Sequence, residues 1–143
     1  MSSTNEFYFT SADGAARVYV KEWLPEGEPC AILLISHGMA EHINRYDEFA
    51  SFLTEYGVLV AGPDHLGHGR SVRSVDDLGF FAEKNGWQLL VENLNQLKIM
   101  EQEAHPGTPI FLLGHSMGSF IARTYMIDYG DDLAGVLLSG TGE

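Results

Sequence analysis

The sequence predicts an α/β fold: a mostly parallel, doubly wound sheet that begins with an antiparallel hairpin and is truncated after about the sixth strand. Two observations support this prediction. Short, continuously apolar runs recur along the chain, as is typical of strands that a parallel sheet buries on both faces. Between these runs the apolar residues follow the period of amphipathic helices. Strands that alternate with helices imply right-handed crossovers, and therefore parallel pairing after the hairpin.

The predicted strands form two groups. Residues 7–10 and 17–23 each mix aromatic and β-branched residues, and Asp13 and Gly14 between them are a turn signal, so an opening hairpin is expected. The later strands are apolar throughout, and we expect them at residues 31–36, 57–61, 110–113 and 135–138.

Two amphipathic helices are expected before the fifth strand. The first spans residues 45–56, with Asn44 as its N-cap and Gly57 as the residue that ends it. The second carries a stripe of large apolar side chains over residues 87–100, and the His-Pro-Gly sequence at 105–107 ends it.

A third amphipathic helix is expected over residues 119–129, immediately before the last strand. Gly130 is the expected stop of this helix. Its apolar side is predicted to carry Phe120, Ile121, Thr124 and Tyr125.

Composition excludes several classes of function. A chain of 143 residues with 45% hydrophobic residues is long enough for one domain with a packed core. Its net charge of -12 repels phosphate backbones, so no nucleic-acid partner is expected. The apolar runs are far shorter than the roughly 20 residues that span a bilayer, so no membrane span is expected. The first residues lack the features of a secretory signal, which makes a cytoplasmic location the default.

One short motif carries candidate chemistry. It matches the G-x-S-x-G pattern of a nucleophile elbow, which by itself recurs by chance in roughly one chain of this length in twenty. Here a predicted strand precedes the motif and a predicted helix follows it, so the serine lies on the strand-to-helix turn that an elbow requires. The glycines avoid side-chain clashes in so tight a turn. The five residues are Gly114, His115, Ser116, Met117 and Gly118, with Ser116 as the candidate nucleophile.

A second candidate feature lies where the strand at 31–36 runs into His37, Gly38 and Met39. In a fold with such an elbow, the loop after this strand supplies one backbone N–H to an oxyanion, and the residue after the nucleophile supplies another. The expected donors are therefore the amides of Met39 and Met117. The dipole of the helix after Ser116 also favours negative charge at this point.

Three motifs occur in a recognisable order: His-Gly-Met-Ala-Glu-His at residues 37–42 with Arg45 and Tyr46 after it, Asp-His-Leu-Gly-His-Gly-Arg-Ser at 64–71, and the elbow at 114–118. From about residue 7 to its end, the chain resembles the monoacylglycerol lipase and lysophospholipase branch (serine aminopeptidase S33-like) of the α/β-hydrolase-fold serine hydrolases. The resemblance implies an acyl-enzyme on Ser116, carboxylic esters of the monoacylglycerol or lysophospholipid type as substrates, and no metal or organic cofactor. We expect the site to be shaped by His37, Gly38, Gly114, His115 and Gly118.

The acid and the base of a catalytic triad are not expected within this chain. In this fold both follow the nucleophile, yet all six histidines, at 37, 42, 65, 68, 105 and 115, precede Ser116. Asp128, Asp131 and Asp132 lie near the end of the helix after the elbow, away from the loop of the acid, and Glu143 is the last residue. We therefore expect residues 1–143 to be the N-terminal half of a single α/β-hydrolase domain, without its cap and C-terminal strands.

Other interpretations remain open at this point. Asp64, His65 and His68 lie close together in sequence, but their glycine-rich segment is better explained as a tight loop, so no metal site is expected. The same glycines do not fit a dinucleotide-binding pattern. The alternative is a short, non-catalytic binding or oligomerisation module on the same fold. A C-terminal half, self-association or a partner chain that completes the triad would cover the open sheet edge. Esterases, thioesterases and peptidases all use this elbow.

Overall fold

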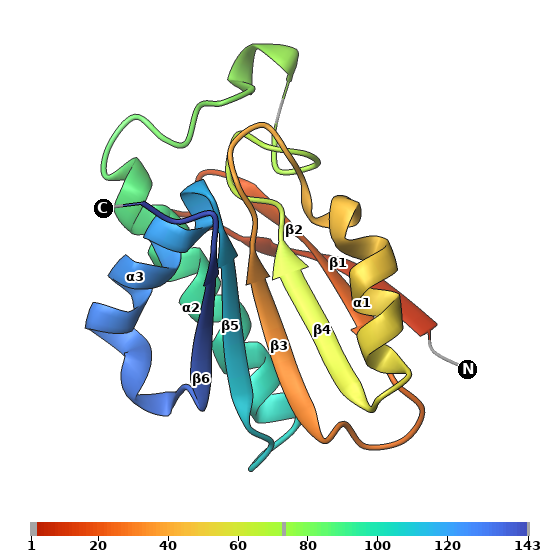
Figure 1. The fold of residues 1–143 in the computed structure, drawn as a ribbon. Helices are drawn as coiled ribbons and strands as arrows, with labels where there is room; N and C mark the ends of the chain where they lie inside the picture. Colours follow the sequence, from red (N-terminus) through yellow and green to blue (C-terminus); the bar gives the residue numbers. More distant parts are fainter. Residues whose placement is uncertain (1–2, 73, 143) are drawn as a thin grey trace.

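Six strands form one sheet in the computed structural model, which describes residues 3–72 and 74–142 (Figure 1). Their order across the sheet is β1-β2-β4-β3-β5-β6. The strands are β1 (Ser3–Thr10), β2 (Arg17–Leu24), β3 (Ala31–Ser36), β4 (Val58–Pro63), β5 (Ile110–His115) and β6 (Gly135–Ser139).

Pairing within the sheet confirms the predicted fold class. β1 and β2 form an antiparallel hairpin, and β2 also pairs antiparallel with β4. β4, β3, β5 and β6 are parallel to one another, as crossovers through helices require. The carboxyl ends of the parallel strands therefore meet at one edge of the sheet, where the segments after β3, β4 and β5 lie close together.

Within the described residues, three α-helices cover the sheet: α1 (Asp47–Thr54), α2 (Gly86–Ala104) and α3 (Met117–Tyr129). Figure 1 shows α2 and α3 behind the sheet and α1 in front of it, beside β4. The larger core lies between the sheet and the α2–α3 layer, and includes Leu34, Leu94 and Leu112. The smaller core lies under α1 and includes Trp23 and Ile35. In the described part of the chain, no helix has the length and apolar character needed to cross a membrane.

The start of the first helix differs from the prediction. Residues Ile43–Tyr46 form the 3-10 helix η1, and α1 begins only at Asp47, so Asn44 is not its N-cap. The Asn44 side chain instead accepts a hydrogen bond from Lys21 Nζ at 2.7 Å, a contact between distant segments that local capping rules do not include. The end of the helix also differs: α1 ends at Thr54 with Glu55 as its C-cap, and Gly57, with φ of +84°, lies in the turn that follows.

The buried side of α3 also differs from the prediction. Ile121 and Tyr125 are fully buried, whereas Phe120 is 38% exposed. The helix is rotated in this way because Gly118 in its first turn lies directly against the end of β3. α3 ends before Gly130 as predicted, but Gly130 has a φ of -72° and the chain continues as the 3-10 helix η3 (Gly130–Asp132).

Candidate functional site

Ser116 lies between the last residue of β5 and the first residue of α3, at the carboxyl edge of the sheet. Its φ of 54° and ψ of -120° are a backbone conformation that residues with a side chain rarely adopt. Hydrogen bonds hold this turn: Ser116 N–H donates to the Ser139 carbonyl at 2.8 Å, and the Ser116 carbonyl accepts from the Ser119 amide at 2.9 Å and its hydroxyl at 2.6 Å. The Ser116 side chain is exposed at the turn.

Two glycines allow the elbow to close. A Cβ on Gly118 would meet the Ser36 carbonyl oxygen and would lie 2.5 Å from that of His37. A Cβ on Gly114 would lie 2.5 Å from the Gly118 carbonyl oxygen and 2.8 Å from Ser119 Cα. Real Cβ atoms do not approach other atoms so closely, so both positions require glycine. The absence of these two side chains lets α3 begin in direct contact with β3.

The loop after β3 lies against the elbow. A Cβ on Gly38 would be 3.2 Å from both Ser116 Cβ and the His115 carbonyl oxygen. Gly38 N–H donates to Glu41 Oε2 at 2.7 Å, whereas no acceptor for Met39 N–H is found among the described residues. Met117 is the first residue of α3, and its N–H therefore belongs to the first turn, which lacks intrahelical acceptors. The structure thus brings both segments that carry the predicted oxyanion donors to Ser116.

A cluster of three buried histidines lies behind this loop. The ring centroids of His37 and His65 are 4.3 Å apart, and those of His37 and His68 are 5.4 Å apart. His37 Nδ1 lies 2.7 Å from the Gly38 carbonyl oxygen, and His37 Nε2 accepts a hydrogen bond from the His65 backbone N–H at 3.0 Å. Burial lowers the pKa of His37 to about 4 and the pKa of His65 well below its ordinary value. Both rings are therefore neutral near pH 7.

Asp64 connects the loop after β4 to the segment before α1. Its buried carboxylate accepts hydrogen bonds from the Ile43 amide at 2.7 Å and the Arg70 amide at 2.8 Å. A Cβ on Gly69 would collide with this carboxylate. Within the described ranges, no three His, Cys, Asp or Glu side chains are arranged to hold a metal ion. The carboxylate of Asp64 thus joins two separate segments through their backbone amides.

No triad forms around Ser116 in the described part of the chain. His115 Nδ1 lies 3.1 Å from Ser139 Oγ, and the hydrogen bonds found there include none from Ser116 Oγ to a histidine or a carboxylate. Asp128 lies near the end of α3 and Asp131 lies in η3, whereas Asp132, also in η3, pairs with Lys98 at 3.0 Å. Glu143 lies outside the described residues.

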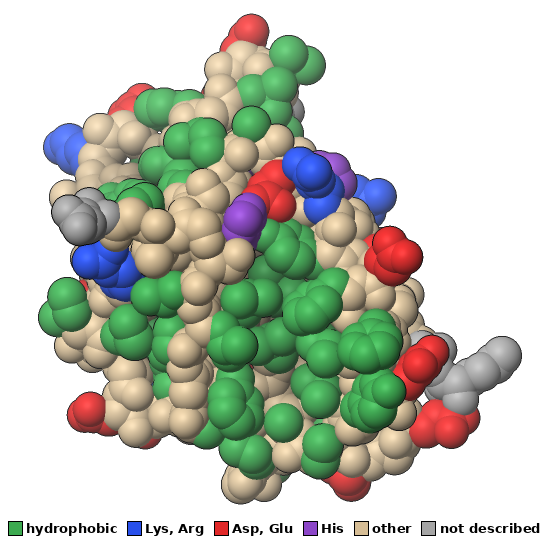
Figure 2. Space-filling view, viewed as in Figure 1, with side chains coloured by type: hydrophobic (Ala, Val, Ile, Leu, Met, Phe, Trp, Pro, Cys, Tyr) green, Lys and Arg blue, Asp and Glu red, His purple; other side chains and the backbone are tan. Residues whose placement is uncertain are grey.

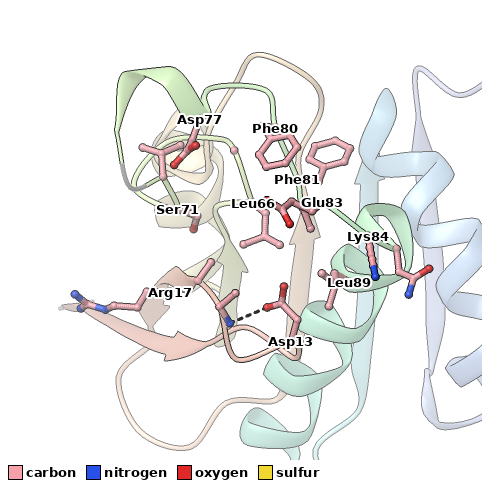
Figure 3. Close-up of a pocket in the computed structure, with 16 residues that line it drawn as sticks. Asp13, Arg17, Leu66, Ser71, Asp77, Phe80, Phe81, Glu83, Lys84 and Leu89 are labelled. Atoms are coloured by element: carbon pink, nitrogen blue, oxygen red, sulfur yellow. Dashed lines mark hydrogen bonds between the residues drawn. The ribbon is translucent and has the colours of Figure 1, made fainter.

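Two cavities flank these loops. One of about 420 Å³ adjoins the elbow and is lined by Glu41, Arg45, Tyr46, Phe49, Leu113, His115 and Ser139. The other, of about 650 Å³, lies between the hairpin turn, the loop after β4 and the start of α2 (Figure 3). Arg17, Asp77 and Lys84 are among its lining residues, whereas Ser116 is not. Ser116 lines neither cavity, but its chain neighbour His115 lines the smaller one. No single sequence motif predicts it, because Glu41, η1 and α1 form it together with the ends of β5 and β6.

Similarity to known proteins covers nearly the whole chain. A family model described as serine aminopeptidase, S33 matches residues 27–142. A monoglyceride lipase homolog of monkeypox virus is 41% identical over 108 residues, which are 73% of this chain and 36% of the viral protein. Rat monoglyceride lipase is 35% identical over 131 residues, 92% of this chain and 41% of that enzyme. Monoacylglycerol lipase of Mycolicibacterium smegmatis is 33% identical over 140 residues, which are 98% of this chain and 48% of that enzyme.

Solved structures also superpose on nearly the whole chain. A thermostable carboxyl esterase from Bacillus coagulans in complex with glycerol superposes with a TM-score of 0.91 at 34% identity, covering 98% of this chain and 45% of the esterase. A soluble variant of Saccharomyces cerevisiae monoglyceride lipase in complex with a substrate analog superposes with a TM-score of 0.79, covering 95% of this chain and 43% of the lipase. Its sequence identity is 20%, so this match is evidence of the fold alone. The chain therefore spans less than half the length of each of these proteins.

Proposed function

The chain belongs to the serine aminopeptidase S33 family and has the α/β-hydrolase fold, and from this premise we propose that it is the N-terminal half of a serine hydrolase of carboxylic esters. Substrates of the monoacylglycerol or lysophospholipid type follow from its monoglyceride lipase relatives. The observation that carries the proposal is the strained, exposed Ser116 beside a loop in which Met39 N–H has no acceptor among the described residues.

In the proposed reaction, Ser116 Oγ attacks the acyl carbonyl carbon while a histidine outside this chain removes the serine proton. The amides of Met39 and Met117 donate to the oxyanion of the tetrahedral intermediate. The intermediate expels the alcohol, which takes the proton from the histidine, and leaves an acyl-enzyme. Water then attacks the acyl-enzyme, releases the carboxylic acid and restores Ser116.

The missing acid and base are assigned to a C-terminal half of the same domain. The relatives support this, because more than half of each compared protein lies outside the match. The runner-up is a non-catalytic module on the same fold, and a third arrangement has a partner chain that completes the triad.

The test uses the complete protein encoded by the reading frame that contains this sequence. We expect Ser116→Ala to abolish both hydrolysis of a monoacylglycerol and labelling by a fluorophosphonate, because no other group replaces the nucleophile. Ser74→Ala, at an exposed serine away from the elbow, is the matched control and should leave both unchanged. Hydrolysis that survives Ser116→Ala would contradict the proposal.

The same samples separate the alternatives. A frame that ends at residue 143 and a product that no fluorophosphonate labels would support the non-catalytic module. Labelling that appears only after a second polypeptide is added would support completion in trans. Comparison of matched ester, thioester and amide substrates would then distinguish esterase from thioesterase and peptidase chemistry.

A further inference from the structure

We propose that His37 is a positioning residue: its ring holds the Gly38–Met39 peptide so that Met39 N–H is presented to the oxyanion formed at Ser116. The inference rests on the proposed function of Ser116 and assigns the position of the oxyanion donor to a side chain that does not contact substrate.

The geometry of one peptide group carries the argument. His37 Nδ1 lies 2.7 Å from the Gly38 carbonyl oxygen, close enough for a hydrogen bond. This carbonyl and Met39 N–H belong to the same trans peptide, in which the two groups lie in one plane and point in opposite directions. Holding the carbonyl therefore also fixes the direction of Met39 N–H. At its other end, Gly38 is held by the bond from its own N–H to Glu41 Oε2.

The backbone of a second loop determines which nitrogen of His37 carries the proton. His65 N–H can only donate, and it points at His37 Nε2 at 3.0 Å, so Nε2 must be unprotonated. The proton of the neutral ring is therefore on Nδ1, where it donates to the Gly38 carbonyl. A carbonyl can only accept, so the opposite tautomer would lose both hydrogen bonds. The His65 amide, in the loop after β4, thus sets the tautomer of His37, in the loop after β3.

Full burial keeps this arrangement intact. His37 has no exposed surface and a lowered pKa, so the ring stays neutral near pH 7. Protonation would place a second N–H at Nε2, directly against the His65 N–H. The neighbouring strain fits a loop held in one shape: Ala40, two residues after Gly38, has a φ of 59°.

Two variants separate the two hydrogen bonds of His37. Asparagine places its amide nitrogen near the position of Nδ1, so His37→Asn keeps a donor for the Gly38 carbonyl. Glutamine places its amide oxygen near the position of Nε2, so His37→Gln keeps an acceptor for His65 N–H and loses the donor. Both variants remove the imidazole ring and differ from each other by one methylene group, so the stability of each is measured beside its kcat.

In the complete enzyme, we expect His37→Gln to lower kcat about tenfold or more with little change in KM, a part of the roughly 100- to 1,000-fold cost of losing an oxyanion donor. His37→Asn should keep most of kcat. His105→Asn and His105→Gln, at the end of α2, are the matched controls and should change neither constant. Equal losses of kcat in the two His37 variants, or losses that follow their stabilities, would overturn the proposal.

A readout that does not depend on catalysis is nitrogen-15 NMR of the same protein labelled at histidine and methionine. We expect the tautomer of His37 with the proton on Nδ1, and a Met39 amide signal that moves in His37→Gln more than in His37→Asn. A proton on Nε2 in the wild-type protein, or a Met39 signal that is unchanged in His37→Gln, would overturn the proposal even if both variants proved unstable. A complete protein without hydrolase activity would contradict the proposed function, and the NMR result would still decide the role of His37.

Discussion

Ser116 combines an exposed hydroxyl with a backbone that a side chain disfavours, since its φ is 54°. Strain of this kind costs of order 1–3 kcal/mol and persists only where surrounding contacts enforce it. Here the contacts are the hydrogen bonds to Ser139 and Ser119. The candidate nucleophile is thus exposed at the expense of local stability.

Replacing Ser116 by glycine should release that strain. Both Ser116→Ala and Ser116→Gly remove the hydroxyl, but only glycine removes the Cβ. After the entropic cost of glycine, we expect Ser116→Gly to have a free energy of unfolding about 1 kcal/mol above that of Ser116→Ala in urea. At Ser119, inside α3, the alanine variant should instead be more stable than the glycine variant, because glycine disfavours a helix. A less stable Ser116→Gly would show that the turn is not strained.

Gly118 gives a second prediction at the residue scale. We expect Gly118→Ala to lower the free energy of unfolding by about 3 kcal/mol, because its methyl group would meet the end of β3. Gly130→Ala, at the other end of α3, is the control and should change it by less than about 1 kcal/mol. Its Cβ would lie 3.4 Å from Met126 Cβ at an ordinary φ. Urea unfolding of both variants measures the difference, and equal effects would contradict the steric argument.

At the scale of elements, α2 carries an unusual buried carboxyl group. Glu101 is 2% exposed, and Oε2 of its side chain has no hydrogen-bond partner among the described residues. Burial, followed by the neighbouring carboxyl group of Glu22 on β2, raises the pKa of Glu101 to about 9. The folded protein therefore holds a proton at Glu101 near pH 7.

This proton makes stability depend on pH. From the ordinary pKa of 4.5 up to about 9, the folded state keeps a proton that the unfolded state releases. The stabilisation is full below this window and is lost as pH rises through it, by at most about 1.4 kcal/mol per pH unit. Glu101→Gln mimics the protonated group, so its stability relative to wild type should rise from pH 5 to pH 8 in urea unfolding. Glu103→Gln, at an exposed position on α2, is the control, and its free energy of unfolding should differ from that of wild type by the same amount at every pH. A constant difference for Glu101→Gln as well would show that Glu101 is ionised in the fold.

At the scale of the whole molecule, the sheet face that carries α1 is only partly covered. No helix of the described residues lies in front of β5 and β6, and Figure 2 shows hydrophobic side chains gathered on this face. Leu137 of β6 is 52% exposed and pairs with Leu113 of β5, and Phe52 of α1 is 54% exposed. Among the described residues, no strand pairs with the outer edge of β6. Such a surface and edge favour association with another chain segment.

We therefore expect residues 1–143, expressed alone, to self-associate through the face around Leu137. Leu137→Lys should raise the monomer fraction in light scattering across a dilution series, because a charge there opposes burial. Ile127→Lys is the control, since Ile127 is 85% exposed on α3 outside this face, and it should change little. A wild-type chain that stays monomeric at every concentration and melts in one sharp transition would contradict this expectation.

The features that the sequence predicted are local ones. Apolar runs identified the strands, and the glycines around Ser116 identified the elbow, because strand burial and tight turns act on neighbouring residues. The same local rules were wrong for Asn44 and for the side of α3 that carries Phe120. In both places a contact with a distant segment decides the outcome: Lys21 binds the Asn44 side chain, and the Gly118 contact fixes the rotation of α3.

By itself, the sequence determined the class of fold, the order of its strands and helices along the chain, and the position of Ser116 on a strand-to-helix turn. Only the tertiary structure decided the antiparallel pairing of β2 with β4, the bond from the His65 amide to His37, and the burial of Glu101 beside Glu22. Those features depend on which distant segments become neighbours. Neither residue propensity nor hydrophobic period specifies such neighbours, because both describe the chain only over the length of a single element.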